Sequence, residues 1–328
     1  MRTLMFSSPA KGTDRTQVTE ITEPRPGPGE VAIEVVNAGI NFLDVMARRG
    51  DAGYVPAWPY APGKEVAGIV REVGAGVTDL PAGTRVAALT PGGGGLAEVA
   101  IAPAALTVPL PDRVPMPVAA AAPLMLASAL LLLTQAGRFS PGDGVMVHSA
   151  SGGIGAAVAQ LVPVLGGGLR IGTVGRPEKA DEARKSGYDV ALTRGDDLAD
   201  EVRRAAADGV DLVLDPLGTS MLDVDLAVAA PGARIVLFGN AGGSQPAPLP
   251  PVKQLMAGNV AIGGFSISGL SVSAPARVAD ALRRVLDLIA TGRLSVDVTD
   301  IGPLTEVAGV HQLLADGRGS GKYVASLR

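Results

Sequence analysis

The chain has 328 residues, of which 47% are hydrophobic, and a formal net charge of −4 at pH 7. This length and apolar content suit two domains with hydrophobic cores, and they exclude a disordered chain despite 44 glycines and 26 prolines. Since the charge is mildly acidic and no long basic run occurs, nucleic-acid binding has no electrostatic support. The absence of cysteine excludes disulfides and thiolate metal sites.

Neither the amino terminus nor the most apolar stretch of the chain predicts a membrane contact. The amino terminus, from Met1 to Phe6, lacks the apolar core of a secretory signal peptide. The most apolar stretch runs from Val118 to Leu133, but Pro123 and Ser128 interrupt it, and a membrane span needs roughly 20 residues. We therefore expect a buried helix there, and a cytoplasmic protein.

The first hundred residues predict a compact β domain. Residues 31–36, 68–73 and 85–89 alternate or run apolar like short strands, and turns rich in glycine and proline separate them. A helical turn is expected after Asn41, extending to Arg49. The glycine run from Pro91 to Gly95 predicts a flexible loop.

The middle of the chain has a different rhythm, in which strands and helices alternate. Strands are predicted at residues 145–148, 169–174, 210–215 and 234–238, with helical segments between them and a last strand from Asn259 to Phe265. A long helix is expected to begin near Ala119 and to lead into this region. The alternation predicts an α/β fold with a parallel, doubly wound sheet.

A turn of small residues follows the first of these strands and opens an alanine-rich helix. It comprises Ser151, Gly152, Gly153, Ile154 and Gly155. Free N–H groups and the positive end of the helix dipole favour an anion here, as in the pyrophosphate cradle of dinucleotide-binding proteins. A glycine-rich turn by itself also occurs in many tight loops, and the surrounding strand–helix–strand pattern strengthens the prediction.

The end of the second strand bears on which dinucleotide is bound. Sites for NAD usually present Asp or Glu at that point to the ribose hydroxyls, whereas this chain has Gly175, then Arg176 and Lys179. Two cations beside a missing side chain suit a 2′-phosphate, so we predict NADPH. The alternative is that both cations belong to a solvated helix start.

Motifs along nearly the whole chain resemble those of the medium-chain dehydrogenase/reductase superfamily, and within it the zinc-independent quinone oxidoreductases that include zeta-crystallin. The motifs that carry the resemblance are Ala38-Gly39-Ile40-Asn41-Phe42-Leu43-Asp44, Pro62-Gly63-Lys64-Glu65, Pro141-Gly142-Asp143, Ser149 to Gly155, Gly172-Thr173-Val174, Asp215-Pro216-Leu217-Gly218 and Phe238-Gly239-Asn240. The resemblance implies a β-rich, GroES-like catalytic domain of residues 1–121 and 266–328, with a Rossmann domain of residues 122–265 inserted between the two parts.

The resemblance also bears on metal binding. Zinc-dependent relatives have a cysteine where this chain has Asn41 and a histidine where it has Lys64, and neither replacement is a zinc ligand. The two histidines, His148 and His311, fall in segments that read as core or helix surface. We therefore expect no metal site.

The resemblance implies roles for residues around the nicotinamide. Asn41 is expected at the nicotinamide ribose, with Asp44 nearby, and Arg318 is expected to reach toward the cofactor. Phe238, Gly239, Asn240, Phe265, Ser266 and Ile267 are expected to hold the carboxamide end.

The expected catalytic set is Asn41, Asp44, Ser128 and Tyr54. For Asp44 and Ser128, a capping or turn role is as plausible as a catalytic one, since hydrogen bonds of that kind are common for these residue types. No general acid stands out, so we expect the proton to come from water.

The substrate pocket is expected to be aliphatic, because Met46, Leu96, Leu130 and Met125 stand where relatives often carry aromatic or polar groups. The resemblance implies a reductase of quinones or of α,β-unsaturated carbonyl compounds that transfers a hydride directly from NADPH. The aliphatic pocket suits a small enone at least as well as a planar quinone. Two alternatives stay open: an enoyl-thioester reductase, and an NADPH-binding protein with little catalysis and a structural role. Relatives dimerise through the strand that matches Asn259 to Phe265, so a homodimer is expected.

Overall fold

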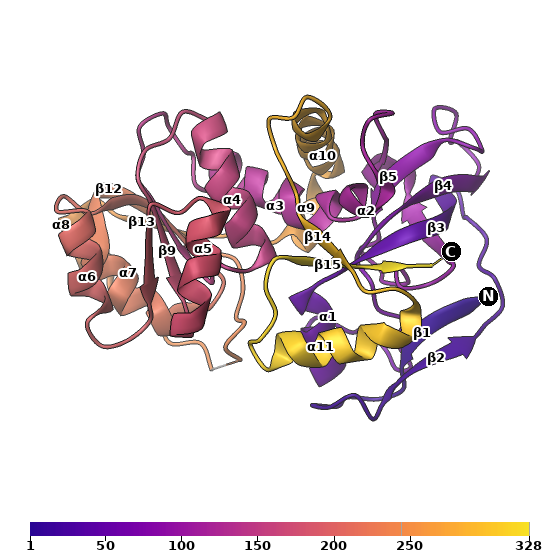
Figure 1. Ribbon diagram of the computed structural model, residues 1–328, viewed down its shortest axis with the longest axis horizontal. Helices are drawn as coiled ribbons and strands as arrows, with labels where there is room; N and C mark the ends of the chain where they lie inside the picture. Colours follow the sequence, from indigo (N-terminus) through magenta and orange to yellow (C-terminus); the bar gives the residue numbers. More distant parts are fainter. Residues whose placement is uncertain (244, 328) are drawn as a thin grey trace. The chain divides into compact units, whose positions relative to one another are not determined.

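The computed structural model describes residues 1–243 and 245–327, and the chain forms two compact units (Figure 1). Met1–Ala127 and Ile267–Arg328 make up the first, which we call the β-rich unit, and Ser128–Ser266 make up the second, the α/β unit. The insertion of one unit between the two parts of the other agrees with the expected architecture.

The β-rich unit is built on a mainly antiparallel sheet. The strand order is β14-β15-β3-β4-β5-β7, and β6 also pairs with β3. The strands are β3 (Glu30–Ile40), β4 (Glu65–Val73), β5 (Arg85–Leu89), β6 (Val99–Pro103), β7 (Thr107–Pro109), β14 (Val298–Asp300) and β15 (Lys322–Ser326). Since β15 pairs with β3, the end of the chain completes the sheet that its first part begins.

The helices of the β-rich unit surround this sheet. They are α1 (Phe42–Arg49), η1 (Ala104–Leu106), α2 (Met116–Ala119), η2 (Ala122–Leu126), α9 (Ile267–Ser273), α10 (Pro275–Ala290), η6 (Leu304–Glu306) and α11 (Val307–Ala315). Helices α1 and α11 lie side by side (Figure 1). The core between sheet and helices includes Phe6, Ile33, Val66 and Leu96. Leu96, expected at the substrate pocket, is fully buried in this core.

The α/β unit has a parallel sheet of order β10-β9-β8-β11-β12-β13. Its strands are β8 (Val145–His148), β9 (Arg170–Val174), β10 (Val190–Thr193), β11 (Val210–Asp215), β12 (Ala229–Leu237) and β13 (Ala261–Gly264). From β8 the chain winds outward through β9 and β10, and then returns to the other side of β8 at β11. The doubly wound sheet is confirmed, and its topological switch point lies between β8 and β11, where ligands bind in such sheets.

The remaining helices flank this sheet (Figure 1). They are α3 (Ala127–Leu131), η3 (Leu132–Ala136), α4 (Gly153–Val164), η4 (Pro177–Lys179), α5 (Ala180–Ser186), α6 (Leu198–Ala205), η5 (Thr219–Met221), α7 (Leu222–Val228) and α8 (Val252–Gly258). Helix α4 ends one residue after Pro163, which lacks the N–H that a regular α-helix needs.

The apolar stretch in the middle of the chain differs from the single regular helix that was predicted. It is a succession of α2, η2, α3 and η3, in which η2 and η3 have π-helical geometry. Pro123 lies inside η2 and lacks the N–H that a regular α-helix needs. Among the described residues, Met116–Ala136 is long and apolar enough to cross a membrane, and 83% of its most apolar window is buried.

Two further elements differ from expectation. A hairpin of β1 (Arg2–Phe6) and β2 (Thr16–Glu20) opens the chain, although the polar sequence of β2 gives no strand signal. Strand β13 begins at Ala261, because Asn259 adopts a left-handed conformation (φ 50°) as the C-cap of α8. The strand predicted from Asn259 to Phe265 is therefore shorter, but it does lie at the edge of the sheet.

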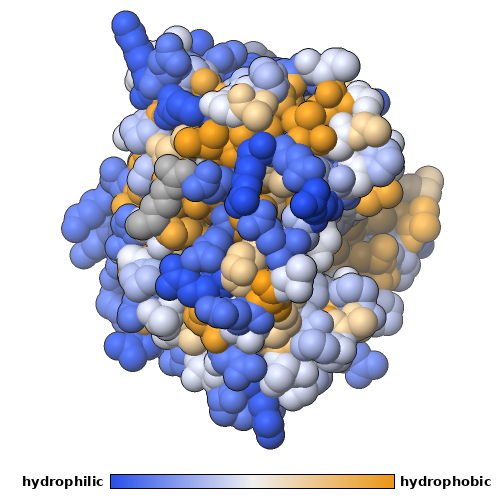
Figure 2. Space-filling view, turned by 90° about the vertical axis from the view of Figure 1, so that its right-hand side faces the viewer, coloured by the Kyte–Doolittle hydropathy of each residue, from blue (hydrophilic) through white to orange (hydrophobic). Residues whose placement is uncertain are grey.

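Apolar residues are scattered over the surface rather than gathered into one broad patch on the face that Figure 2 shows. Among the described residues, large apolar side chains are most exposed at Val272 in α9 and at Leu249, Val252 and Met256, around α8. Those around α8 precede the edge strand β13 and bear on the oligomeric state proposed below.

Candidate functional site

The predicted anion cradle is a tight connection between β8 and α4. Ser149 turns the chain with a left-handed conformation (φ 58°), and Gly152 is the N-cap of α4. At Gly155 a Cβ atom would lie 2.4 Å from the carbonyl oxygen of Ala150. A glycine at this position therefore lets the first turn of α4 pack directly on the end of β8.

The amino terminus of α4 leaves backbone donors without helical partners. Ala156 donates to the carbonyl of Gly152 in the first turn, so the N–H groups of Gly153, Ile154 and Gly155 have no acceptor within the helix. Together with Ser151 they lie at the carboxyl end of β8, beside the switch point of the sheet. Backbone donors and a helix dipole at this point suit a phosphate group.

The predicted cations follow the end of β9. Arg176 directly precedes η4, and the ammonium group of Lys179 lies 3.7 Å from the carboxylate of Glu182. Strand β10 pairs with β9 and brings Arg194, which the sequence analysis did not single out, beside Gly175. The N–H of Arg194 donates to the carbonyl of Val174 at 2.9 Å.

Backbone hydrogen bonds join the carboxyl ends of β11 and β12 beside the switch point. The N–H of Phe238 donates to the carbonyl of Asp215 at 2.9 Å, and that of Ala241 donates to the carbonyl of Pro216 at 2.9 Å. A Cβ at Gly239 would lie 2.7 Å from this Pro216 oxygen, so a glycine is needed for the approach. The structure thus brings Phe238, Gly239 and Asn240 to the carboxyl edge of the sheet.

The three remaining residues of the predicted carboxamide site divide between the units. The N–H of Phe265 donates to the carbonyl of Leu237 at 2.9 Å, and Ser266 ends the α/β unit. Ile267 begins α9 in the β-rich unit, where it is buried. The roles of these residues at the nicotinamide stay predictions.

A buried polar network lies beneath the switch point of the α/β unit. The ring of His148 bonds Thr173 Oγ1 through Nδ1 (2.6 Å) and Asp225 Oδ1 through Nε2 (2.8 Å). Burial, followed by the charge of Asp225, raises the pKa of Asp215 to about 6. His148 thus ties β8, β9 and α7 together, as the core role expected for it implies.

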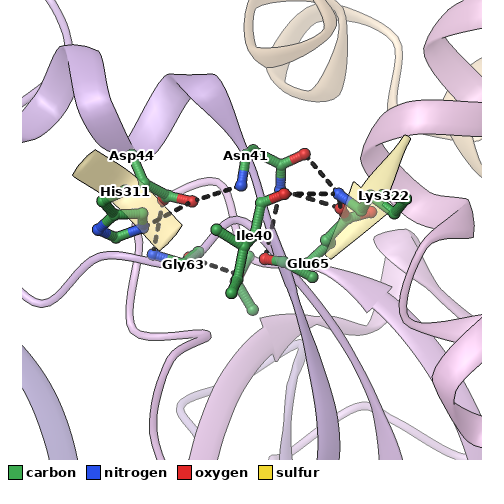
Figure 3. Close-up of polar contacts among 9 residues, drawn as sticks. Ile40, Asn41, Asp44, Gly63, Glu65, His311 and Lys322 are labelled. Carbon is green, nitrogen blue, oxygen red and sulfur yellow. Dashed lines mark hydrogen bonds and ion pairs between the residues drawn. The ribbon is translucent and has the colours of Figure 1, made fainter. Parts of the chain in front are cut away.

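In the β-rich unit, Asn41 is held by a buried ion pair (Figure 3). The ammonium group of Lys322 donates to Asn41 Oδ1 at 2.6 Å, to the carbonyl of Ile40 at 3.0 Å and to Glu65 Oε1. Asn41 Nδ2 donates in turn to Glu65 Oε1 at 2.9 Å and to the carbonyl of Gly39 at 3.3 Å. Glu65 also accepts from the N–H of Leu124 at 2.7 Å through Oε2.

These bonds fix which way the amide of Asn41 points. All three N–H donors of Lys322 have acceptors, and both amide hydrogens of Asn41 are directed at acceptors as well. The remaining capacity of this side chain is the second lone pair of Oδ1. Sequence reasoning missed Glu65 and Lys322, although a carboxylate and an ammonium within two strands of mainly apolar residues are a signal for a buried pair.

Asp44 holds the start of α1. Its Oδ2 accepts from the N–H of Asn41 at 3.0 Å, and its Oδ1 accepts from the N–H of Gly63 at 3.1 Å (Figure 3). His311 Nε2 lies 3.8 Å from Oδ2, and the ring packs in a T-shaped arrangement with that of Phe6. The carboxylate therefore joins α1 to the turn before β4, which is the capping role left open for it.

Three further residues were predicted for the site: Tyr54, Ser128 and Arg318. Tyr54 is half-buried, and burial raises the pKa of its hydroxyl. Ser128 is buried in α3 of the α/β unit. Arg318 follows α11 in the β-rich unit, and its N–H donates to the carbonyl of Leu313 at 3.0 Å.

Lys64 stands where zinc-dependent relatives are expected to have a zinc-binding histidine, and its side chain makes other contacts. Lys64 Nζ donates to the carbonyl of Pro91 at 2.7 Å and lies 5.6 Å from the ring centroid of Tyr60. Burial lowers the pKa of Lys64. Within residues 1–243 and 245–327, no group of three or more His, Cys, Asp or Glu side chains is placed to hold a metal ion.

Comparison with family models matches both units. Residues 27–112 match the alcohol dehydrogenase GroES-like domain, and residues 153–289 match the zinc-binding dehydrogenase family. Among curated proteins, the human synaptic vesicle membrane protein VAT-1 homolog is 30% identical over 316 residues, which are 92% of this chain and 80% of that protein. Rat quinone oxidoreductase is 32% identical over 227 residues, covering 68% of each protein.

A third relative is much longer than this chain. It is a phenolphthiocerol/phthiocerol polyketide synthase component of Mycobacterium tuberculosis, and it is 31% identical over 319 residues. These residues are 96% of this chain but 14% of that protein.

Solved structures match over the full length. Escherichia coli quinone oxidoreductase complexed with NADPH has a TM-score of 0.90 and 27% identity, covering 99% of this chain and 100% of that one. The mycobacterial protein Rv1454c complexed with NADPH has a TM-score of 0.89 and 31% identity, covering 99% of both chains.

A GroES-like unit interrupted by a Rossmann unit defines an oxidoreductase of the medium-chain dehydrogenase/reductase superfamily. Within that superfamily, the chain belongs to the zeta-crystallin-like quinone oxidoreductase subfamily, as the resemblance of its motifs implies.

Proposed function

We propose that the protein is an NADPH-dependent reductase that transfers a hydride directly, without a metal, to a quinone or an α,β-unsaturated carbonyl compound. The observation that carries this proposal is the arrangement at the ends of β8 and β9. There, cations and the helix amides that have no acceptor within α4 adjoin a glycine in place of an acidic residue. Two solved relatives contain NADPH, which supports the same cofactor.

The residues at this edge of the sheet fit NADPH. The N–H groups of Gly153, Ile154 and Gly155 would hold the pyrophosphate. Gly175 lacks the acidic side chain that NAD-binding sites present at this point, and Arg176 and Lys179 add positive charge beside a 2′-phosphate.

At the nicotinamide end we propose Asn41 for the ribose and Asn240 for the carboxamide, as the resemblance implies. Because both amide hydrogens of Asn41 are engaged, its Oδ1 would accept a hydrogen bond from a ribose hydroxyl. When bound, the nicotinamide supplies the hydride, and the protein supplies position and electrostatics. Tyr54 and Ser128 are proposed to line the substrate side, and Asp44 to hold α1 and Gly63 in place.

Metal independence is supported by the chemistry of the available donors. Asn41 and Lys64 occupy the positions where zinc-dependent relatives are expected to have a thiolate and an imidazole. Both side chains are engaged in other contacts, with Lys322 and Glu65 for Asn41 and with Pro91 for Lys64. Neither an amide nor an ammonium group is a ligand that zinc prefers.

The proposal is tested by following NADPH oxidation with quinones, enones and enoyl thioesters, each with and without a strong chelator. We expect turnover of quinones or enones, a preference for NADPH over NADH, and no loss with chelator. Activity that chelation abolishes and zinc restores would contradict metal independence. Tight NADPH binding without turnover of any acceptor would instead indicate a binding protein.

The second candidate is reduction of an enoyl thioester. The specific observation in its favour is that a polyketide synthase component is similar over 96% of this chain. Turnover of enoyl thioesters alone in the same assay would place this candidate first.

We also propose a homodimer formed through β13. This strand lies at the edge of the sheet with its last two residues exposed, so its outer backbone groups are available for pairing. Exposed apolar side chains of Val252 and Met256 in the preceding helix add apolar surface.

A further inference from the structure

We propose that Arg194 binds the 2′-phosphate of the dinucleotide, and that Gly175 and Arg194 together select NADPH over NADH. This inference rests on the proposed function, since it names the residues that read the cofactor's phosphate. It adds a cation that is remote in sequence from Arg176 and Lys179 and that only strand pairing brings to the site.

The position of Arg194 follows from the parallel pairing of β9 and β10. Thr193 pairs with Val174, so the next residue on each strand, Arg194 and Gly175, emerge together at the carboxyl edge of the sheet. The guanidinium group turns back over its neighbour: Nη2 lies 2.6 Å from the point that a Cβ of residue 175 would occupy. Arg194 thus fills the space that the glycine leaves.

The guanidinium group has a donor without an acceptor. Within the described part of the chain, Nη1 of Arg194 is buried and has no hydrogen-bond partner. The carboxylate of Asp215 is near enough to raise the pKa of Arg194, against the larger lowering by burial, but its Oδ2 also lacks a partner among the described residues. The two groups therefore do not bond through these atoms.

An unpaired buried donor on a charged group is costly, and a phosphate oxygen is the acceptor that best relieves it. The guanidinium plane presents several N–H groups that match two phosphate oxygens at once. A ribose hydroxyl, which is all that NADH offers at this point, has no charge to pair with it.

Residue 175 affects phosphate binding because a side chain there would compete with Arg194 for space. A methyl group at position 175 would meet the far end of a flexible side chain, so the protein accommodates it by moving Arg194 rather than its backbone. An acidic side chain there would in addition neutralise the guanidinium group. Glycine is therefore required at position 175 if Arg194 is to bind the 2′-phosphate.

Isothermal titration calorimetry of purified full-length protein tests the proposal with four ligands: NADPH, NADH, 2′,5′-ADP and 5′-AMP. For Arg194→Gln we expect NADPH and 2′,5′-ADP to bind about 10- to 100-fold more weakly, with NADH and 5′-AMP unchanged. The matched control is Arg204→Gln, which removes the same charge from an exposed position of α6 and should change none of the four affinities.

A double-mutant cycle tests the coupling. Gly175→Ala should weaken NADPH and 2′,5′-ADP in the wild-type background, and should have no further effect on their preference over NADH and 5′-AMP in the Arg194→Gln background. Additive effects would overturn the coupling.

Three other outcomes would count against the proposal, and they are distinguishable. If Arg194→Gln weakens all four ligands equally, Arg194 is structural. If it weakens none while the wild type prefers NADPH, the inference fails and the proposed cofactor stands. If the wild type binds neither dinucleotide, the proposed function fails with it.

Discussion

Lys322 and Glu65 form a buried ion pair in which each charge depends on the other for compensation. Their side chains are 4% and 0% exposed, and together they orient Asn41. Removing one partner of a buried pair leaves the other charge unpaired, which costs about 3–5 kcal/mol. We therefore predict that Lys322→Met lowers the free energy of unfolding by about this amount in urea denaturation.

A surface pair provides the control for this prediction. Arg2 and Glu98 form an ion pair with side chains 59% and 32% exposed, so Arg2→Gln should cost less than about 1 kcal/mol. Equal, small effects of the two substitutions would mean that Lys322 carries little of the stability of the β-rich unit.

The titration of Asp215 predicts a pH dependence. The pKa of its carboxyl is raised to about 6 in the folded protein, against about 3.9 in an unfolded chain. The folded state therefore binds the proton more tightly. The stability that this group contributes is full below pH about 4 and is lost as pH rises through about 6.

The isosteric variant Asp215→Asn tests this dependence, because its side-chain oxygen can still accept from the N–H groups of Leu217 and Gly218. Above pH 7 we expect it to be more stable than the wild type, on the order of 1–3 kcal/mol. The difference should shrink as pH falls from about 6 to about 4 in denaturant titrations. A pH-independent difference would contradict the raised pKa.

At the scale of elements, the packing of α4 on β8 depends on one glycine. A Cβ at Gly155 would lie 2.4 Å from the backbone oxygen of Ala150, and a backbone atom cannot swing aside. Gly155→Ala should therefore displace the first turn of α4, weaken NADPH binding more than tenfold and lower the melting temperature. Calorimetry and thermal denaturation measure the two effects.

Gly309→Ala in α11 is the control, since its Cβ would meet nothing within 4 Å. Alanine is about 1 kcal/mol better than glycine inside a helix, so this variant should be as stable as the wild type or more so. If Gly155→Ala behaves like this control, the tight approach of α4 to β8 is wrong.

Local pattern predicted those elements whose sequence is apolar and bounded by turns. Strands β8, β5 and β11 have the predicted limits, because each is mainly buried and mainly apolar. Strand β2 was missed because pairing with β1, rather than apolar content, makes it a strand. The start of β13 was misplaced because the left-handed Asn259 is not visible in composition.

The residues of the candidate site also differ in whether local sequence predicts them. The turn from Ser151 to Gly155 is contiguous and lies within a strand–helix–strand pattern, so local sequence predicted the cradle. Lys322 and Glu65 are 257 residues apart, and Arg194 meets Gly175 only through the pairing of β10 with β9. Contacts of this kind follow from the tertiary fold and have no local pattern.

For the whole molecule, the proposed dimer makes a prediction about mass. Sedimentation velocity at micromolar concentration should give a single species of two 32.9 kDa chains. In hydrogen exchange, the backbone amides of β13 should be protected, because a partner strand would cover that edge. A monomer with rapidly exchanging β13 amides would contradict the dimer.

The central claim is a direct, metal-free hydride transfer from NADPH, and isotope labelling tests it most directly. Metal-depleted protein is supplied with NADPH carrying deuterium in the transferred position at C4, together with an enone, and the product is examined by NMR. We predict one deuterium on the β-carbon of the reduced product. A product without deuterium, or one that forms only after zinc is added, would contradict it.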